Sequence, residues 1–384
     1  MAGPAALGEL TARASAPARV EVVQRLAPGD DAAVRALLRR SVIPGAVRVA
    51  FTREPSYALG DGVAGARDHL VVARTGGTIV GLGRGSVRTL YRNGERHAVA
   101  YLGELRLAEG VGRGVSLLRE GYEALAGAMA GHGIQACFTS IASDNRRART
   151  VLEHGPRLGL PAYTPLATLV TLVAPVPRGG PRRRGTGGAP APGVAAPSMV
   201  ALAGFLDRAA RERHLTLPWD AARLHALSAH GVSPGDAVVA TGDGGQVGAA
   251  ALWDQRAFRQ VIIDGYGGAL RRTRPLVNVA LWLAGSPRLP APGTALAQAS
   301  LLGATVATPD DWRILWPLVA RAAARRGVEW VTLARDARDP ELAVLRPLLR
   351  GREYHTTLYD VALRGTPTGT PWDARLVRPE VGLL

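Results

Sequence analysis

Residues 100–125, AYLGELRLAEGVGRGVSLLREGYEAL, contain the pattern that decides the fold. Strand-forming residues continue to position 107, glycines and an arginine follow, and apolar residues then return. These recur three or four positions apart, as on one face of an amphipathic helix, at Val115, Leu118, Tyr122, Leu125 and Met129. The segment therefore predicts a long strand, a glycine-rich turn and a helix.

The glycine-rich turn, EGVGRGVS at 109–116, has two interpretations. It is an ordinary turn in a glycine-rich chain, or it binds phosphate. A helix that starts after such a turn presents unpaired backbone N–H groups and the positive end of its dipole, which both favour anions. Glycine also lets an anion approach the backbone closely. The strand before the turn and the helix after it favour the phosphate interpretation.

Composition limits the classes of protein that the chain can represent. Its 384 residues suit two domains of ordinary size. The net charge of +16 favours an anionic ligand, but the chain has no lysine, and its arginines accompany 47 glycines and 27 prolines, a bias typical of GC-rich genomes. We therefore expect no dedicated nucleic-acid partner. The single cysteine, Cys137, and the scattered histidines predict neither a disulfide nor a metal site.

Segments that direct a protein to a membrane are not evident. Residues 1–18 lack the apolar stretch of a signal peptide and are interpreted as a flexible N-terminus. No segment approaches the roughly 18 uncharged apolar residues that a membrane span requires. We expect a cytoplasmic protein without a membrane span.

A segment rich in Pro, Gly and Arg, residues 177–197, separates two halves that resemble each other. Both halves contain a strand, a glycine turn and a second strand, at 71–83 and 238–250. Both also contain a buried strand followed by a polar helix start, at 133–145 and 327–339. Because these matches occur in the same order, a tandem duplication explains them.

The remaining periodicity indicates an α+β fold. In the first half it predicts a strand at 19–26, a helix at 30–40 capped by GDD, a strand at 134–141, a helix at 145–154 and a strand at 164–175. Residues 81–86, GLGRGS, are interpreted as an edge strand with bulges. Five tryptophans of the second half are expected to pack in its core: Trp253, Trp282, Trp312, Trp316 and Trp330.

Two stretches resemble a known family. Residues 100–125 are similar to the fourth strand, acetyl-CoA loop and third helix of the GCN5-related N-acetyltransferase (GNAT) superfamily. Residues 140–163, SIASDNRRARTVLEHGPRLGLPAY, resemble its fifth strand and fourth helix. The resemblance implies two tandem GNAT-like domains, at 19–176 and 198–364, followed by a C-terminal tail at 365–384. Each domain would be a mixed, mostly antiparallel central sheet flanked by helices.

The resemblance also implies a cofactor, acetyl-CoA as acyl donor. The family loop reads Arg or Gln, two residues, Gly, one residue, then Gly or Ala. If Gly114 takes the glycine position of this pattern, Val111 replaces the Arg or Gln. If Arg113 takes the first position instead, Ser116 replaces the glycine at which the phosphate approaches the backbone closely. We favour the alignment on Gly114, because the close approach requires a residue without a side chain. The implied contacts with acetyl-CoA come from the strand, the loop and two helix starts: Leu105, Arg106, Leu107, Gly112, Arg113, Gly114, Val115, Ser116, Leu117 and Asn145.

The second half differs at the corresponding position, where TPDDW at 308–312 replaces the glycines. Oxygens of Thr308, Asp310 and Asp311 would satisfy the N–H groups of the helix start, and the carboxylates would repel phosphate. We therefore expect acetyl-CoA in the first domain only. The second domain would form the other wall of the substrate cleft or a dimer surface.

The resemblance assigns the chemistry to few residues. Backbone N–H groups at 105–107 would polarise the thioester carbonyl, and Glu104 would take the proton of the acceptor ammonium through water. The alternative is that Glu104 is an ordinary strand residue paired with Arg106 or Arg147.

The acid that protonates the departing thiolate is less well matched. Leu152 stands where the family has a tyrosine. Tyr163 either substitutes for that tyrosine or packs in the core. Thiolate can depart without an enzymic acid, so the substitution does not exclude activity. Tyr57 is expected to line the acceptor pocket.

These features predict an N-acetyltransferase that transfers an acetyl group from acetyl-CoA to an amine of a small molecule or peptide. A catalytically silent GNAT-fold binding protein is the second hypothesis, which Leu152 and the irregular loop favour. A tandem acyl or aminoacyl transferase acting on a cell-wall or lipid precursor is the third. A homodimer is one expected assembly.

Overall fold

The computed structural model describes residues 19–23, 26–111, 114–177, 199–232, 234–243, 245–367 and 371–384. The predicted flexible segment 1–18 lies outside these residues. So do nearly all of the predicted linker and two predicted cofactor contacts, Gly112 and Arg113.

The first half of the chain follows the predicted order of elements, with one further strand, β2 (Val47–Thr52), that the sequence did not predict. They are β1 (Arg19–Val23), α1 (Pro28–Arg40), β2 (Val47–Thr52), β3 (Arg67–Thr75), β4 (Thr78–Arg92), β5 (Glu95–Leu107), α2 (Gly114–Met129), β6 (Ile134–Ala142), α3 (Arg146–Glu153) and β7 (Ala162–Pro175). The strand and helix predicted at 100–125 are β5 and α2, so this part of the prediction is confirmed.

The second half repeats much of this order. Its elements are α4 (Met199–Arg211), α5 (Ala221–Ala226), β8 (Ala237–Gly242), β9 (Gly245–Trp253), β10 (Gln260–Tyr266), α6 (Leu270–Leu283), β11 (Gln298–Val306), α7 (Trp312–Arg325), β12 (Trp330–Asp336), α8 (Glu341–Leu349) and β13 (Arg352–Ala362). The hairpin predicted at 238–250 is β8 and β9, and the β11–α7–β12–α8–β13 order matches β5–α2–β6–α3–β7.

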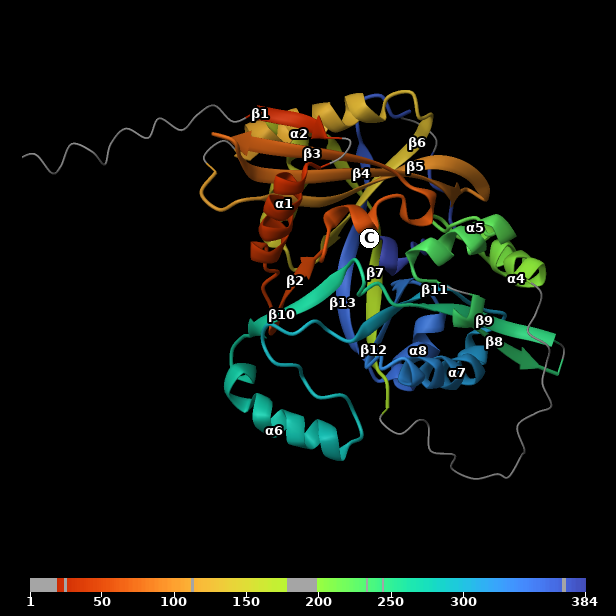
Figure 1. Cartoon of the computed structure of the whole chain (residues 1–384). Helices are drawn as coiled ribbons and strands as arrows, with labels where there is room; N and C mark the ends of the chain where they lie inside the picture. The colour runs from red at the N-terminus through yellow and green to blue at the C-terminus, as the bar shows by residue number, and fades with distance from the viewer. Residues whose placement is uncertain are drawn as a thin grey trace, which may run out of the picture.

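The two halves share one eleven-stranded sheet, in the order β1-β3-β4-β5-β6-β13-β7-β12-β11-β9-β8. The last strand of each half is exchanged with the other half: β13 lies antiparallel between β6 and β7, and β7 lies antiparallel to β12. Figure 1 shows β7 and β13 crossing the centre of the molecule. The halves are therefore joined through backbone hydrogen bonds, although 178–198 separates them along the chain.

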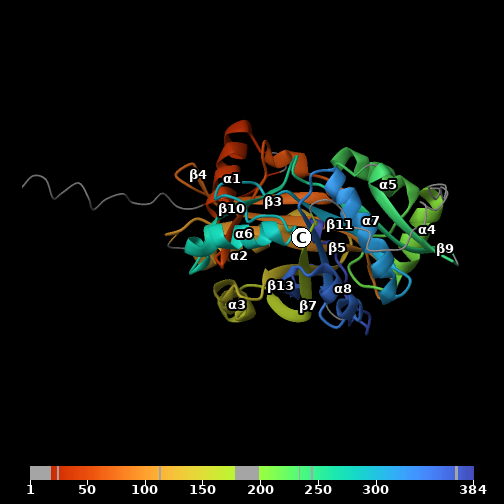
Figure 2. The same ribbon diagram turned by 90° about the horizontal axis from the view of Figure 1, so that it is seen from below.

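Helices cover both faces of this sheet. Because successive strand residues point to opposite faces, Val71 of β3 packs with α2, whereas Val72 packs with α1. Figure 2 shows α1 and α5 on one side of the sheet and α3 and α8 on the other. A two-stranded ladder of β2 and β10 lies apart from the large sheet and carries α6.

Several local predictions need correction. α1 begins at Pro28 and has Ala27 as its N-cap without a side-chain hydrogen bond, because the Asp31 carboxylate instead accepts from Tyr57 N–H. Residues 81–86 are not an edge strand, because β4 lies between β3 and β5, and the bulge at this point is in β5, where two residues lie opposite Gly83. Trp282 is 54% exposed and does not pack in the core. No helix among the described residues is long and apolar enough to cross a membrane.

The segment predicted as a C-terminal tail returns to the centre of the molecule (Figure 1). Val377 is 1% exposed and forms a β-bridge with His214. The Arg259 side chain donates to the carbonyls of Gly382 and Leu384. The last described residues therefore belong to the folded core.

Candidate functional site

The candidate site begins at a β-bulge in β5. Between the pairs Arg84↔Gly103 and Leu82↔Arg106, β5 has two residues and β4 has one. Glu104 is one of the two, and its φ of 55° lies in the left-handed region. A bulge interrupts the hydrogen-bond ladder and redirects side chains. It therefore changes the direction of Glu104 and leaves an irregular backbone at 104–106.

The parallel strands β5 and β6 part beside this bulge. Their pairing runs from Ala98↔Ile134 to Leu102↔Thr139 and stops, although both strands continue. The Thr139 hydroxyl donates to the Leu102 carbonyl at 2.6 Å. Within the described part of the chain, residues 103–107 have no strand partner on their β6 side. An opening between two parallel strands is thus bordered by the bulge.

The start of α2 lies at the end of this opening, because α2 follows β5 at Gly114. The first turn of α2 has no acidic residue. A Cβ on Gly114 would contact only Leu107 Cδ1, at 3.7 Å, so packing within the described chain does not require glycine here. Val115 and Ser116 are partly exposed, and Leu117 is buried. This segment fits a ligand whose anionic group approaches a helix N-terminus.

Asn145 borders the same end of the opening. It follows β6, which runs parallel to β5, and it is exposed. Its side chain accepts from the Ala148 N–H at 3.2 Å and caps α3, as the predicted helix start requires. The structure therefore brings the start of α2 and Asn145 to one edge of the sheet.

Glu104 forms an ion pair with Arg53, the residue that follows β2. Arg53 Nε donates to Glu104 Oε1 at 2.6 Å, and the Tyr57 hydroxyl donates to Oε2. The Arg53 guanidinium also lies 5.0 Å from the centre of the Tyr57 ring. Of the two predicted partners, Arg106 instead donates to the carbonyl of its own neighbour, and the side chain of Arg147 lies outside the description. The partner of Glu104 comes from another strand.

Arg84 adds a second positive charge to this cluster. It is 5% exposed and lies 2.7 Å from Asp68. Burial alone would raise the pKa of Glu104, but Arg53 and Arg84, together with the hydrogen bond from Tyr57, lower that pKa to about 2. Burial beside Glu104 raises the pKa of Tyr57. The cluster is therefore an ionised carboxylate that contacts the Arg53 guanidinium and a neutral tyrosine, with the charge of Arg84 nearby.

Tyr163 and Glu104 lie on opposite faces of the sheet. Tyr163 is 8% exposed, packs with α2, and forms a hydrogen bond with the Tyr122 hydroxyl. Leu152 packs in the same cluster, whereas Glu104 contacts Tyr57 on the α1 face. The structure does not bring the two predicted catalytic side chains together.

Tyr101 is a site residue that the sequence reasoning missed. Its hydroxyl lies 2.8 Å from the Ser140 hydroxyl, which joins β5 and β6 where they part. Burial raises the pKa of Tyr101, so the phenol stays protonated. A Cβ on Gly103 would lie 2.8 Å from the Tyr101 ring, so the ring requires this glycine. The sequence YLGE at 101–104 is a local pattern, but it does not distinguish a tyrosine in the core from a tyrosine beside the opening.

The second half has the same backbone irregularity. The register of β11 against β9 shifts between Leu302 and Thr305, and Gly303 has a φ of 61°. The pairing of β11 with β12 ends at Ser300↔Thr332. The duplication therefore extends to the bulge and to the parting of the parallel strands.

Side chains fill this second opening. Arg335 of β12 is 2% exposed, and it donates to the Ala304 carbonyl at 2.9 Å and to Glu341 at 2.8 Å. The carboxylate of Glu380 accepts from the Gly303 N–H at 3.1 Å. An ion-paired network thus bridges β11 and β12 at the place that is open between β5 and β6.

The helix start of the second half is also satisfied by its own side chains. Thr308 and Asp311 form a capping box, in which Asp311 accepts from the Thr308 N–H at 2.8 Å. This confirms the predicted cap for Thr308 and Asp311, whereas Asp310 accepts from the Arg313 side chain at 3.1 Å. The carboxylates of Asp310 and Asp311 place negative charge where α2 has none.

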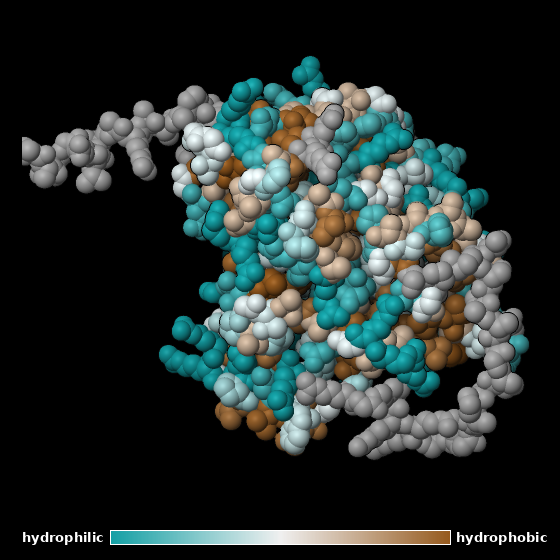
Figure 3. Space-filling model, in the orientation of Figure 1, coloured by the Kyte–Doolittle hydropathy of each residue, from teal (hydrophilic) through white to brown (hydrophobic). Residues whose placement is uncertain are grey.

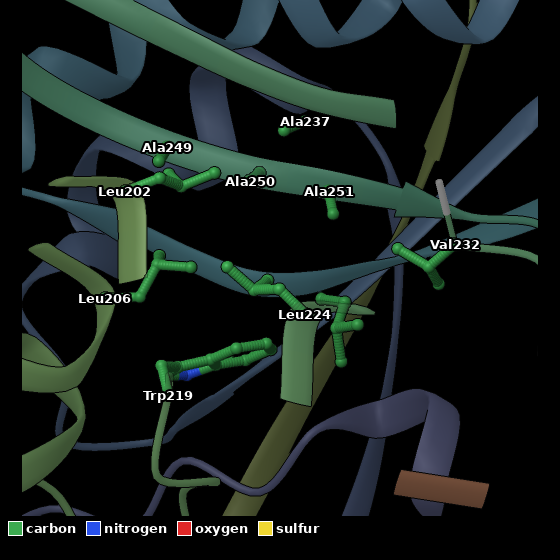
Figure 4. Close-up of a pocket in the computed structure, with 10 residues that line it drawn as sticks. Leu202, Leu206, Trp219, Leu224, Val232, Ala237, Ala249, Ala250 and Ala251 are labelled. Carbon is green, nitrogen blue, oxygen red and sulfur yellow. The ribbon is translucent and has the colours of Figure 1, made fainter. Parts of the chain in front are cut away.

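A separate small cavity of about 20 Å³ lies between α4, α5 and the β8–β9–β11 part of the sheet. Figure 4 shows Leu202, Leu206, Trp219 and Ala249 around it. All the side chains that line it are apolar. Since it offers no side chain that could orient a polar group or accept a proton, we assign no chemistry to it.

Comparison with known proteins finds similarity at the level of structure. No family model and no curated protein matches the chain. N-myristoyltransferase of Saccharomyces cerevisiae with bound myristoyl-CoA matches with a TM-score of 0.56 at 11% identity, over 94% of this chain and 89% of that one.

Two further structures match this chain over their own whole length. They are a GCN5-related N-acetyltransferase from Sphaerobacter thermophilus (TM-score 0.48, 16% identity, 92% of this chain and 100% of that one) and a tandem GNAT protein from the clavulanic acid biosynthesis pathway (TM-score 0.49, 14% identity, 91% and 100%). The likeness to N-myristoyltransferase, with its TM-score of 0.56 at 11% identity, establishes the fold and not the activity. The chain has the α+β acyl-CoA N-acyltransferase (GNAT) fold, with two such units in tandem.

Proposed function

We propose that the protein is an N-acetyltransferase that binds acetyl-CoA in its first half and transfers the acetyl group to an amine of a small molecule or peptide. The difference between the halves carries this proposal. Both have a bulge beside two parting parallel strands, but Arg335 bridges the second opening and acidic residues precede α7. Within the described part of the chain, only the first half combines the opening with a helix that does not follow an acidic turn such as Pro309–Asp311.

The described residues that are proposed to hold the cofactor lie on β5, at the start of α2 and before α3. N–H groups from 112 to 117 would bind the pyrophosphate, Arg113 would add positive charge, and Asn145 would contact the pantetheine arm. The bulged backbone at Leu105–Leu107 would donate to the acyl carbonyl oxygen. When bound, acetyl-CoA supplies the thioester that is attacked.

Glu104 is the proposed group that receives the acceptor's proton through water. Its low pKa keeps it ionised at neutral pH, which suits an acceptor that arrives as an ammonium ion. The same low pKa gives little driving force for proton removal. That observation favours a second candidate function, a protein that binds acyl-CoA without transferring the acyl group.

Titration calorimetry with acetyl-CoA is expected to detect one site per chain. The lack of acidic residues in the first turn of α2 and the bridged second opening are the physical reasons for this stoichiometry. Release of free CoA thiol with a panel of amines then distinguishes the enzyme from the silent binder. The absence of heat at about 1 mM cofactor, which corresponds to less than about 4 kcal/mol of binding free energy, would contradict both candidates.

The two tyrosines are expected to differ in their effect on turnover. Tyr101 joins the parting strands, whereas Tyr163 is bonded to Tyr122 in the core. If Tyr101 is the acid, Tyr101→Phe lowers kcat by roughly 100-fold and leaves acetyl-CoA affinity unchanged, while Tyr163→Phe has little effect on kcat. Steady-state kinetics of both variants measure this. The reverse pattern assigns the acid to Tyr163, which is one of the two alternatives that the sequence leaves open.

A further inference from the structure

α6 lies on the β2–β10 ladder with one face only. Its inward residues Leu270, Val277 and Leu281 pack against a small cluster that includes Ile263 and Tyr266. The Asn278 side chain attaches the same face to the segment that follows the helix, by hydrogen bonds to the backbone of residue 289. Figure 1 shows α6 well away from the large sheet, at the lower edge of the molecule. The helix is therefore held in place while its outer face stays uncovered.

The outer face of α6 is apolar. Leu276 is 73% exposed, Val279 55%, Trp282 54% and Leu283 73%. The spacing of 276, 279 and 283 places these side chains on one side of the helix. Figure 3 shows hydrophobic residues gathered over α6 at the lower edge of the molecule. Among the tryptophans, all of which are described, Trp282 is the one with an exposed side chain.

Positive charge without negative charge borders this face. Residues 265–309 contain no aspartate and no glutamate, but they contain Arg271, Arg272, Arg274 and Arg288. Arg271 and Arg272 are exposed at the start of α6 and form no ion pair with the described residues. Arg274 lies 5.6 Å from the centre of the Tyr266 ring.

We propose that the outer face of α6 docks on the surface of an anionic phospholipid bilayer. Leucine, valine and tryptophan on one face, with arginines beside them, are the composition of helices that lie in the plane of a membrane interface. The apolar side chains enter the boundary between headgroups and acyl chains, and the arginines contact the phosphates. This proposal does not depend on the proposed acetyl transfer.

Charge favours a lipid surface over a second copy of this chain. A dimer through this face would bury the apolar side chains of both copies, but no carboxylate on either α6 segment could neutralise the four arginines. An anionic bilayer supplies both the apolar layer and the negative charge.

Docking of α6 on a membrane would also fix the position of the candidate site relative to that membrane. β10 pairs along β2, and the Gln260 side chain at the start of β10 accepts from the Thr52 hydroxyl and the Glu54 N–H, both at 2.9 Å. Arg53, the partner of Glu104, lies between those two residues. A short rigid ladder thus connects the proposed membrane-docking helix to the Glu104 cluster.

Vesicle flotation of the full chain tests the proposal. Phosphatidylcholine vesicles that contain about 30% phosphatidylglycerol are expected to bind the protein at least tenfold more tightly than phosphatidylcholine alone, because each arginine near an anionic surface contributes roughly fivefold in affinity. Salt at about 0.5 M should remove most of this preference. Equal affinity for both vesicle types, or no binding to either, would overturn the proposal.

Matched variants locate the docking surface. Leu276→Glu and Leu283→Glu change exposed side chains and should abolish flotation without changing the unfolding midpoint. Ile314→Glu, at a 43% exposed position on α7, is the control and should float like the parent protein. Arg271→Gln combined with Arg272→Gln should weaken binding by roughly 25-fold.

Tryptophan fluorescence gives a second readout. Brominated lipid is expected to quench the parent protein through Trp282 and to leave Trp282→Phe unquenched. Sedimentation velocity tests whether a second copy of this chain occupies the outer face of α6 instead. A dimer that Leu276→Glu dissociates, together with no binding to anionic vesicles, would assign this face to self-association and overturn the proposal.

Discussion

Replacing Gly114 with tryptophan is expected to abolish acetyl-CoA binding, with a loss of at least roughly 100-fold in affinity, or about 2.7 kcal/mol. Gly114 is the first residue of α2, and a Cβ there would meet only Leu107 within 4 Å. The chain itself therefore has room at this position, and a large side chain would occupy the space in front of the helix N-terminus. Titration calorimetry with acetyl-CoA measures the effect, and the unfolding midpoint should stay close to that of the parent protein.

Two control variants make this result specific. Gly127→Trp puts the same side chain on an exposed part of the same helix, where a Cβ would meet nothing within 4 Å, and should bind acetyl-CoA normally. Asp310→Gly removes one carboxylate that precedes α7 and should also change nothing. Loss of binding in Asp310→Gly with normal binding in Gly114→Trp would mean that the cofactor binds in the second half.

Replacing Glu104 with alanine is expected to lower the free energy of unfolding by about 3–5 kcal/mol at pH 7, because it leaves Arg53 without its partner in a buried environment. The Glu104 side chain is 20% exposed and the Arg53 side chain 11% exposed, so water replaces the lost contacts poorly. Urea unfolding measures the change. Glu123→Ala, at an exposed position of α2, is the matched control and should stay within about 0.5 kcal/mol of the parent protein.

The same ion pair predicts how stability depends on pH. The pKa of Glu104 is about 2 in the folded chain and 4.5 without these contacts. A lowered pKa contributes stability that is present above pH 4.5 and is lost as the pH falls towards 2. The shift corresponds to roughly 3 kcal/mol. Glu104→Gln should therefore lose less stability than the parent protein between pH 5 and pH 2.5, where the unfolded parent chain takes up this proton before the folded chain does. Parallel curves for the two proteins would show that Arg53 does not hold Glu104 in its ionised form.

Local sequence patterns predicted the strand–turn–helix unit at 100–125 because each of its signals acts within a few residues. Alternation, glycines and the spacing of apolar residues determine β5, the turn and α2 without reference to the rest of the chain. The Asn145 cap is predictable for the same reason, since a cap bonds to N–H groups two or three residues away. So is the difference between the start of α2 and the helix start of the second half, which Thr308 and Asp311 cap.

Other parts of the site depend on contacts between distant segments. The pairing of Glu104 with Arg53 joins residues 51 positions apart, and it depends on the bulge that redirects Glu104. The partners that the sequence suggests, Arg106 and Arg147, lie 2 and 43 positions from Glu104, so separation along the chain does not identify the partner. Tyr163 was selected for its residue type, and only the packing of the sheet puts it on the face opposite Glu104.

The sequence by itself determined two related α+β halves and a helix start in the first that has no acidic first turn, because periodicity and capping are short-range effects. Only the tertiary structure decided that the halves exchange their last strands, that Arg335 bridges the second opening, and that Trp282 is exposed on α6. Each of these depends on which strand lies next to which. Strand order is set by the burial of whole sheet faces and by backbone hydrogen bonds between distant segments, and no local pattern records it.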